Sequence, residues 1–396
     1  MINIAVLGFG TVGAGVADVI EMNNSIISKR AGDAVRVKYI LDIRDFPASP
    51  YVGRFTKDFG VIETDPEVSV VVETMGGTGA ALDFSRRALA AGKSVVTSNK
   101  ELVASHGYEL LRLARGKNVN YLFEASVGGG IPILRPLYQC LAANEIEEIC
   151  GILNGTTNYI LTRMVHQGAD FADALREAQA KGYAEKDPAD DVEGHDAARK
   201  ICILSSLAFG RHVYPVSVPT EGISGISLSD VGIAEKAGYA IKLLGRAVKR
   251  ADGRVSAYVA PHLVPLDSPI ASVEGVFNAV LVRGNVVGDV MFYGQGAGKL
   301  PTASAVLADV IDAAQHRKTR KTFDWEDGGS EFVADSGTII MRCFVSAQGR
   351  GAELEKAFPG CEVLGSGACI TPAMSVESAR EAIWHIPGAK LIRVLG

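Results

Sequence analysis

The stretch INIAVLGFGTVG, residues 2–13, decides the fold of the first part of the chain. Its apolar, β-branched run over 2–7 predicts a buried strand, and the pattern that follows predicts a helix through Ile20. Between them, the spacing Gly-x-Gly-x-x-Gly allows a tight turn, close backbone approach to a ligand and close packing of strand on helix. The N-terminus of such a helix also attracts a pyrophosphate. The order strand, glycine turn, helix therefore predicts a dinucleotide-binding unit.

More alternating strands and helices follow this fingerprint. Alternation of this kind predicts an open parallel sheet whose ligands bind beyond the carboxyl ends of its strands. The second strand ends at Asp42 and Arg44. An acid there favours the ribose hydroxyl of NAD, whereas an arginine accommodates the phosphate of NADP, so the sequence leaves the cofactor open. Apolar runs predict these further strands at 35–41, 68–72, 94–97 and 121–123.

Several polar or glycine-rich loops stand at predicted strand ends. Lys100 opens a predicted helix, where a cation opposes the helix dipole, and this conflict favours a functional role. The three glycines 128–130 predict either close approach to a ligand or a hinge between domains, and both interpretations stay open. The stretch 151–159, GILNGTTNY, forms a polar, glycine-bearing turn between a predicted strand and helix and suits a small polar ligand, although helix capping explains part of it.

The segment 178–200, AQAKGYAEKDPADDVEGHDAARK, combines a helix end at Gly182, an acidic loop and a new helix from about Asp190. That helix would carry Asp196 and Lys200 on the same face as Leu204 and Leu207. A lysine on an apolar stripe is rarely there for packing, because burial disfavours its charged form. By spacing alone, an exposed i,i+4 ion pair is the stronger interpretation and a functional lysine the alternative.

Composition bounds the class of protein. A length of 396 residues with 47% hydrophobic and 21% charged residues predicts a globular protein of two or three domains. The net charge of −5 argues against an electrostatic nucleic-acid partner. We expect no membrane partner, because no apolar run reaches about 18 residues. The N-terminal residues show neither the basic region nor the cleavage site of a signal peptide, and the six cysteines form no close pair. We therefore expect a cytoplasmic location with reduced thiols.

The second half of the chain predicts further structure and a small terminal module. A glycine-rich segment, 291–299, leads into a helix from Pro301 to about Ala314, which suggests contact with an anion or a cofactor. A charged, glycine-containing shift near 312–327 then marks a domain boundary. Beyond it, the order β-α-β-β-α-β predicts a ferredoxin-like module. Upstream of the loop we predict a helix at 228–244 and strands at 255–264 and 280–286.

These residues resemble the homoserine dehydrogenase family, over essentially the whole chain up to about residue 320. Supporting motifs, in the family's order, are GFGTVG, ETMGG, SNKELVA, FEASVGGGIPI, GILNGTTNYIL and MFYGQGAGKLPTASAV. The family's signature is met at Ala178, Gly182, Tyr183, Ala184, Asp187, Pro188, Asp191, Val192, Gly194, Asp196 and Lys200.

The resemblance implies reversible NAD(P)-dependent interconversion of L-homoserine and L-aspartate 4-semialdehyde, in threonine, methionine and isoleucine biosynthesis. It implies that Lys200 transfers the proton, that Lys100 is a second active-site lysine, and that Asp196 orients substrate or a bound water. Glu185 and Asp191 would hold the substrate amino group, with Gly155, Thr156 and Tyr183 completing the pocket. The cofactor, NADP or NAD, would contact Gly8, Phe9, Gly10, Thr11, Val12, Gly13, Arg44, Thr74, Met75, Gly76, Ser98, Lys100 and Gly296. Main-chain oxygens of Glu124, Val127 and Gly129 would hold a monovalent cation, Na⁺ or K⁺.

The resemblance also implies an α/β architecture of three parts. These are a Rossmann domain at 1–130, completed by about 290–318, a substrate-binding and dimerisation domain at 131–290, and an ACT-like module at 325–396. The module is short and lacks the family's Asp-x-Pro-Gly turn, so assembly and threonine sensing both stay open. We expect a homodimer or a larger homo-oligomer. The alternative to an enzyme is a catalytically silent NAD(P)-binding amino-acid sensor, which would be expected to have lost Lys200 or Asp196.

Overall fold

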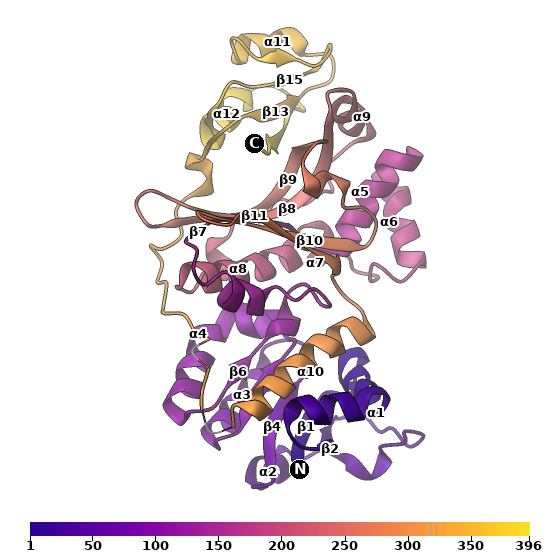
Figure 1. The fold of residues 1–396 in the computed structure, drawn as a ribbon. Helices are drawn as coiled ribbons and strands as arrows, with labels where there is room; N and C mark the ends of the chain where they lie inside the picture. Colours follow the sequence, from indigo (N-terminus) through magenta and orange to yellow (C-terminus); the bar gives the residue numbers. More distant parts are fainter. Residues whose placement is uncertain (318, 322) are drawn as a thin grey trace. The chain divides into compact units, whose positions relative to one another are not determined.

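The computed structural model describes residues 1–317, 319–321 and 323–396. Figure 1 traces its elements along the chain. The contacts group the chain into two compact units, each built from separate segments. Unit 1 comprises 1–143, 203–214 and 294–328, and unit 2 comprises 144–202, 215–293 and 329–396.

Unit 1 is organised around a parallel sheet. Its order is β3-β2-β1-β4-β5-β6, and each neighbouring pair among the described strands is parallel. The order reverses between β1 and β4, which is where such sheets bind ligands at the carboxyl ends of their strands. The strands are β1 (Ile2–Leu7), β2 (Val35–Leu41), β3 (Phe55–Thr56), β4 (Val68–Glu73), β5 (Ser94–Thr97) and β6 (Tyr121–Leu122). This arrangement confirms the predicted Rossmann-type sheet.

Helices cover this sheet, and a late segment of the chain joins them. The helix α10 (Lys299–Gln315) packs along α1 (Thr11–Ala31), as Figure 1 shows. The two backbones approach closely at Gly15, where a Cβ atom would lie 2.8 Å from the carbonyl oxygen of Lys299. The other helices of the unit are α2 (Phe59–Thr64), α3 (Gly79–Ala90) and α4 (Lys100–Lys117). Residues 294–328 group with unit 1. That this late segment completes a Rossmann domain stays a prediction.

Unit 2 contains a mixed sheet, which among the described residues has nine strands in the order β11-β10-β7-β8-β9-β17-β13-β15-β14. Its centre is β9 (Val255–Pro265), buried along nearly its whole length. Helices α5 (Gly155–Gln167), α6 (Phe171–Ala180), α7 (Ala189–Val192) and α9 (Leu228–Lys236) belong to this unit, and α8 (His195–Phe209) begins in it. The neighbouring strands are β7 (Ile146–Ile152), β8 (Tyr239–Lys249), β10 (Phe277–Gly284) and β11 (Gly288–Gln295).

The segment 329–396 extends the same sheet. Its main elements follow the predicted β-α-β-β-α-β order: β13 (Cys343–Ser346), α11 (Gly351–Ala357), β14 (Glu362–Val363), β15 (Ala368–Ile370), α12 (Val376–Ile383) and β17 (Lys390–Val394). A short pair, β12 (Ile340–Met341) with β16 (Met374–Ser375), lies apart from the main sheet. Because β17 pairs in parallel with β9, at Arg393 opposite His262, the segment groups with unit 2. An ACT-like relationship and the predicted domain boundaries stay predictions.

Two local predictions were wrong. The expected helix over 228–244 ends at Lys236, and β8 begins at Tyr239, because Gly238 adopts φ +83° and β8 pairs on both sides with β7 and β9. The helix expected from about Asp190 is interrupted between α7 and α8 at Gly194, which has φ +82°. A side chain at Gly194 would also lie 3.0 Å from Thr220 and Val259.

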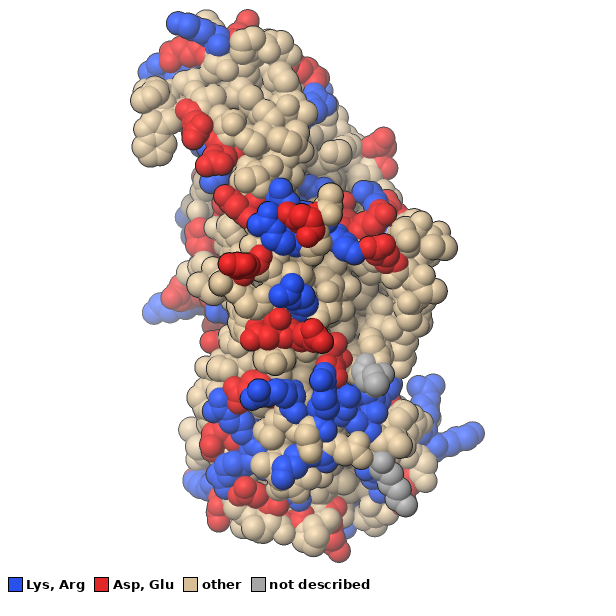
Figure 2. Space-filling model, turned by 90° about the vertical axis from the view of Figure 1, so that its left-hand side faces the viewer, with Lys and Arg blue, Asp and Glu red and all other residues tan. Residues whose placement is uncertain are grey.

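Surface charge is of mixed sign. In Figure 2, Lys and Arg gather over one part of the visible face, with Asp and Glu among them. In unit 1, the ion pairs Arg86–Glu109, Arg87–Glu63 and Arg115–Asp324 balance several arginines. Within the described residues, every helix is too short or too polar to span a bilayer.

Two glycines of α4 provide a test of packing in unit 1. A Cβ at Gly107 would lie 2.6 Å from Cζ2 of Trp325, whereas a Cβ at Gly116 meets nothing within 4 Å. Alanine gains up to about 1 kcal/mol of helix propensity over glycine, but overpacking a core costs about 1–3 kcal/mol. We therefore expect Gly107→Ala to lower the unfolding free energy and Gly116→Ala to raise it slightly. Denaturant unfolding measures both, and equal effects would contradict the contact.

Candidate active site

The glycine turn after β1 is shaped by the residues that surround it. Gly8 has φ +87°, and a Cβ there would lie 3.0 Å from Cγ of Met75. A Cβ on Gly13 would lie 1.9 Å from the Gly8 carbonyl oxygen, so the turn requires glycine at both positions. The hydroxyl of Thr74 donates to the carbonyls of Leu7 and Gly8 at 3.0 and 2.9 Å. The predicted cofactor residues in the loop after β1 therefore lie against those in the loop after β4, Thr74 and Met75.

Gly10 has a different environment. A Cβ there would meet no atom within 4 Å. Its glycine is thus not required by packing within the chain, and open space at this position suits close approach of a phosphate to the start of α1. Thr11 and Val12 begin that helix. The residues present therefore fit a dinucleotide.

The end of β2 holds its acid and its arginine in one ion pair. Asp42 accepts from the main-chain N–H of Phe9 at 2.7 Å and from the Arg44 guanidinium at 2.9 and 3.0 Å. The Arg44 guanidinium holds the pKa of Asp42 down, at about 2. The Arg44 side chain is 59% exposed and the Asp42 side chain 5% exposed. A ligand that arrives from solvent at this strand end therefore meets the cation rather than the acid.

Glu73, at the end of β4, is a buried acid beside the same loops. Its carboxyl accepts from the Thr97 hydroxyl at 2.5 Å and from the main-chain N–H of Met75 at 2.7 Å. Burial raises the pKa of Glu73 to about 7, although both hydrogen bonds oppose the shift. Ser98 and Lys100 follow at the end of β5, where the main-chain N–H of Ser98 donates to the Glu73 carbonyl at 3.3 Å.

A buried lysine is the centre of the polar cluster in unit 2. The Lys200 amine donates to the Leu153 carbonyl and to Asp196 Oδ2, each at 2.7 Å. Lys200 is 8% and Asp196 4% exposed. The interpretation of this i,i+4 pair as an exposed ion pair was therefore wrong. Asp196 and Lys200 lie in the first turns of α8 and are buried like Leu204 further along the same helix.

Asn154 connects the carboxylates of this cluster. The sequence pointed to its turn as a ligand site but assigned no role to Asn154 itself. Its amide donates to Asp191 Oδ1 at 2.6 Å and to Asp196 Oδ2 at 2.9 Å. Its Oδ1 caps α5 by accepting from the main-chain N–H of Thr157 at 2.9 Å. Burial raises the pKa of Asp191, and the nearby Asp196 carboxylate adds to this, whereas Asn154 opposes it. An asparagine between an apolar strand and a helix was the available signal.

The other predicted substrate residues fall into two groups. Gly155 begins α5, and a Cβ there would lie 2.6 Å from the Val276 carbonyl oxygen. Thr156 donates from its hydroxyl to the carbonyl of Tyr183 at 2.6 Å, which joins the acidic loop to α5. Glu185 is exposed, and its carbonyl accepts from Gln179 at 3.0 Å. Tyr183 and Thr156 thus lie beside the lysine cluster, whereas these contacts do not bring the Glu185 carboxylate to it.

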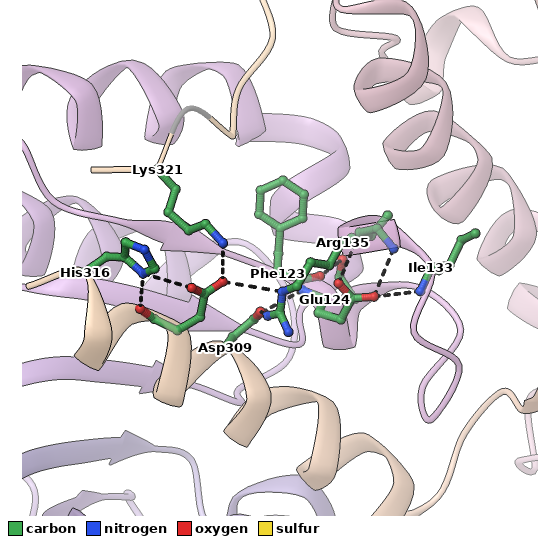
Figure 3. Close-up of polar contacts among 10 residues, drawn as sticks. Phe123, Glu124, Ile133, Arg135, Asp309, His316 and Lys321 are labelled. Atoms are coloured by element: carbon green, nitrogen blue, oxygen red, sulfur yellow. Dashed lines mark hydrogen bonds and ion pairs between the residues drawn. The ribbon is translucent and has the colours of Figure 1, made fainter. Parts of the chain in front are cut away.

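The predicted cation segment begins in a buried polar network of unit 1 (Figure 3). The Glu124 carboxylate accepts from the main-chain N–H groups of Ile133, Leu134 and Arg135 at 2.7 to 2.9 Å. The Glu124 N–H donates to Asp309 of α10 at 2.7 Å, and Asp309 pairs with the Arg135 guanidinium. Burial raises the pKa of both acids, and the Arg135 charge opposes this. The network fixes both ends of loop 124–135 to α10.

Glycines shape the middle of that loop. Gly128 and Gly129 have φ +74° and +53°, and a Cβ on Gly129 would lie 2.5 Å from the Gly296 carbonyl oxygen. The two glycine-rich loops therefore touch through their backbones. The Glu124 carbonyl receives a long bond, 3.5 Å, from the N–H of Val127. Within the described ranges, no cluster of three His, Cys, Asp or Glu side chains could hold a metal ion.

Comparison with known proteins gives this arrangement a family. The model of the homoserine dehydrogenase NAD-binding domain matches residues 8–124, and that of homoserine dehydrogenase matches residues 132–311. The chain belongs to the homoserine dehydrogenase family. A homoserine dehydrogenase of Neisseria gonorrhoeae is 46% identical over 316 residues, 79% of this chain and 72% of the relative. One of Corynebacterium glutamicum is 46% identical over 323 residues, 80% of this chain and 72% of the relative.

Solved structures agree with this assignment. The crystal structure of a homoserine dehydrogenase from Thiobacillus denitrificans has a TM-score of 0.91 at 36% identity, covering 100% of this chain and 98% of that one. A hyperthermophilic archaeal homoserine dehydrogenase in complex with NADPH has a TM-score of 0.67 at 29% identity, covering 79% of this chain and 97% of that one. The chain is therefore an NAD(P)-dependent oxidoreductase of the homoserine dehydrogenase type.

The buried Glu73 should make the stability of unit 1 depend on pH. An acid with a raised folded-state pKa stabilises the fold fully below its unfolded pKa, and this contribution is lost as pH rises through the folded value. A shift from 4.5 to about 7 corresponds to about 3 kcal/mol, lost between about pH 4.5 and pH 7. We expect Glu73→Gln, which keeps a neutral side chain, to gain thermal stability relative to the parent as pH rises from 5 to 8. Glu355→Gln, at an exposed position, is the control. The expectation is contradicted if the melting temperatures of the parent and of Glu73→Gln change equally between pH 5 and pH 8.

Proposed function

We propose that the chain oxidises L-homoserine to L-aspartate 4-semialdehyde, reversibly and with NAD(P), in threonine, methionine and isoleucine biosynthesis, and that Lys200 transfers the proton. The observation that carries this proposal is the buried cluster of Lys200, Asp196, Asn154 and Asp191 at the start of α5 and α8. A silent NAD(P)-binding sensor is the rival, and the intact Lys200–Asp196 pair argues against it.

The proton chemistry follows from the position of the lysine. When bound, the nicotinamide accepts or gives the hydride of the reaction. In aldehyde reduction the Lys200 ammonium gives its proton to the forming alkoxide, and in homoserine oxidation the neutral amine takes the hydroxyl proton. Asp196 and the Leu153 carbonyl fix the amine at 2.7 Å each, so its direction is set before substrate arrives. Lys100, in unit 1, is proposed as the second active-site lysine.

Substrate recognition is assigned to groups around the same cluster. Asp191 is proposed to bind the substrate ammonium, because a cation favours the ionised form of a carboxyl whose pKa burial has raised. Glu185 would contribute a second carboxylate from the exposed acidic loop. Gly155, Thr156 and Tyr183 would complete the pocket, and the Thr156–Tyr183 hydrogen bond supports their grouping.

A monovalent cation, Na⁺ or K⁺, is proposed at the main-chain oxygens of Glu124, Val127 and Gly129. The long bond to the Glu124 carbonyl and the left-handed glycines support this, because such carbonyls keep lone pairs for a hard cation. We further propose a cytoplasmic homodimer, or a larger homo-oligomer. Whether threonine acts on residues 329–396 is decided by assays of activity with and without it.

Replacing Lys200 tests the proposal. Lys200→Met should lower kcat for homoserine oxidation at least about 100-fold, because general acid–base catalysis contributes about 10² to 10⁴. Because homoserine oxidation needs the neutral Lys200 amine, we expect the parent rate of oxidation to rise with pH, and Lys200→Met should lose this rise. NAD(P)H absorbance measures both. Lys186→Met, in the exposed loop, is the control and should behave as the parent. A Lys200→Met enzyme with parental rate and pH profile would refute the assignment.

Arg44 is proposed to set the cofactor preference towards NADP, since it is the exposed partner of the Asp42 pair. Arg44→Ala should raise the KM for NADP about tenfold or more, as expected for loss of about 1.5–3 kcal/mol from a charged hydrogen bond. The KM for NAD should change little. Arg36→Ala, exposed on β2, the strand that precedes Arg44, is the control. Equal changes for NAD and NADP would show that Arg44 does not read the phosphate.

A further inference from the structure

The loop 273–277 of unit 2 is held by an unusual buried clamp. Asn158, on α5, donates from its amide to the carbonyls of Val273, Gly275 and Phe277 at 3.1 to 3.2 Å. Lys242, on β8, donates to the Val273 carbonyl at 2.6 Å and to Asn158 Oδ1 at 3.4 Å. A single side-chain pair thus gathers three carbonyls of one short loop.

Thr162 adds to this clamp one turn further along α5. Its hydroxyl donates to the Asn158 carbonyl at 2.7 Å and accepts from the N–H of Gly275 at 3.0 Å. The loop is therefore attached to α5 at two successive turns. It follows that the loop cannot move away from α5 without breaking several buried hydrogen bonds.

Burial of the Lys242 amine is energetically unfavourable. Lys242 is 5% exposed, and burial lowers the pKa of its amine to about 8, which the Glu274 carboxylate opposes. Among the described residues, no carboxylate forms an ion pair with it. Its hydrogen-bond partners are the neutral oxygens already named. An ammonium buried without a paired acid is unfavourable, so its presence calls for a role that an apolar side chain of similar length would not supply.

Loop 273–277 packs closely against Gly155, the first residue of α5. The Val276 carbonyl oxygen lies 2.6 Å from the position that a Gly155 Cβ would take. Gly155 follows Leu153 and Asn154, whose carbonyl and amide hold Lys200, Asp191 and Asp196. One turn of chain, 153–158, therefore bears the lysine cluster at its beginning and the clamped loop at its end.

From these contacts we infer that Asn158 and Lys242 are positioning residues for the reaction, because they seat loop 273–277 against Gly155 and so fix the turn that holds Lys200. Neither side chain contacts Lys200 in the described hydrogen bonds. Both act through the backbone of the turn. The inference rests on the proposed role of Lys200, and misplacing a catalytic group by about 1 Å can cost about 100-fold in rate.

The test uses the full chain with Lys242→Met and Asn158→Leu, which keep shape and remove the donors. Each should lower kcat/KM for homoserine about 10- to 100-fold per folded enzyme, while the Kd for NADPH, from fluorescence titration, stays within twofold of the parent. Lys242→Arg should restore most of the loss, because it keeps charge and donors and a cavity of about 160 Å³ adjoins Lys242. Lys249→Met, exposed on the same strand, is the matched control.

Coupling to Gly155 separates positioning from ordinary stability. If the clamp acts through Gly155, then adding Lys242→Met to Gly155→Ala should lower kcat/KM little further. A merely structural role would lower the melting temperature with parental kcat/KM per folded enzyme, and that result would overturn the inference. If the parent does not oxidise homoserine, or Lys200→Met retains activity, the proposed function itself fails. Activity that needs Lys200 but tolerates Lys242→Met and Asn158→Leu rejects the clamp alone.

Discussion

The burial of the Lys200 ammonium is the constraint on which the substrate side of this fold depends. Removing a charged amine from water costs several kcal/mol unless its partners are already in place. The chain supplies the Leu153 carbonyl at the end of β7 and the Asp196 carboxylate one helical turn away. Asn154 then restrains Asp196 and Asp191 together. The same few residues therefore set both the charge environment of Lys200 and the backbone conformation at 153–154, so that a change in one alters the other.

Local patterns predicted the parts of the structure that local physics decides. The glycines at 8, 10 and 13 predicted the dinucleotide turn, because only short-range sterics are involved. The same reasoning failed over 239–244, where an apolar run fits a helix or a strand equally well. Gly238 after Lys236 was the missed stop signal, as a left-handed glycine at a helix end. Pairing of β8 with strands on both sides decided the outcome.

Other features depend on contacts between residues far apart in the sequence, which periodicity cannot reveal. Glu124 meets Asp309 across 185 positions, and Asn158 meets Phe277 across 119. Resemblance to the family gave Lys200, Asp191 and Asp196, but it gave neither the buried state of the pair nor the amide that joins its acids. The ion pair between Asp42 and Arg44 was also not predictable. The sequence offered the acid as a sign of NAD and the arginine as a sign of NADP, whereas the structure pairs the two side chains.

The late pairing of one edge of β9 affects how the chain folds. That edge is covered in turn by Val333, by Thr220 and by β17, which brings Arg393 opposite His262. During synthesis, β9 emerges well before its last partner, and an unpaired apolar edge invites pairing with other chains. Sheets completed by distant segments also form slowly, because the loop entropy must be lost first. Unit 2 should therefore be the slow and aggregation-sensitive part of folding, whereas α1 and β1 can pair with their neighbours early.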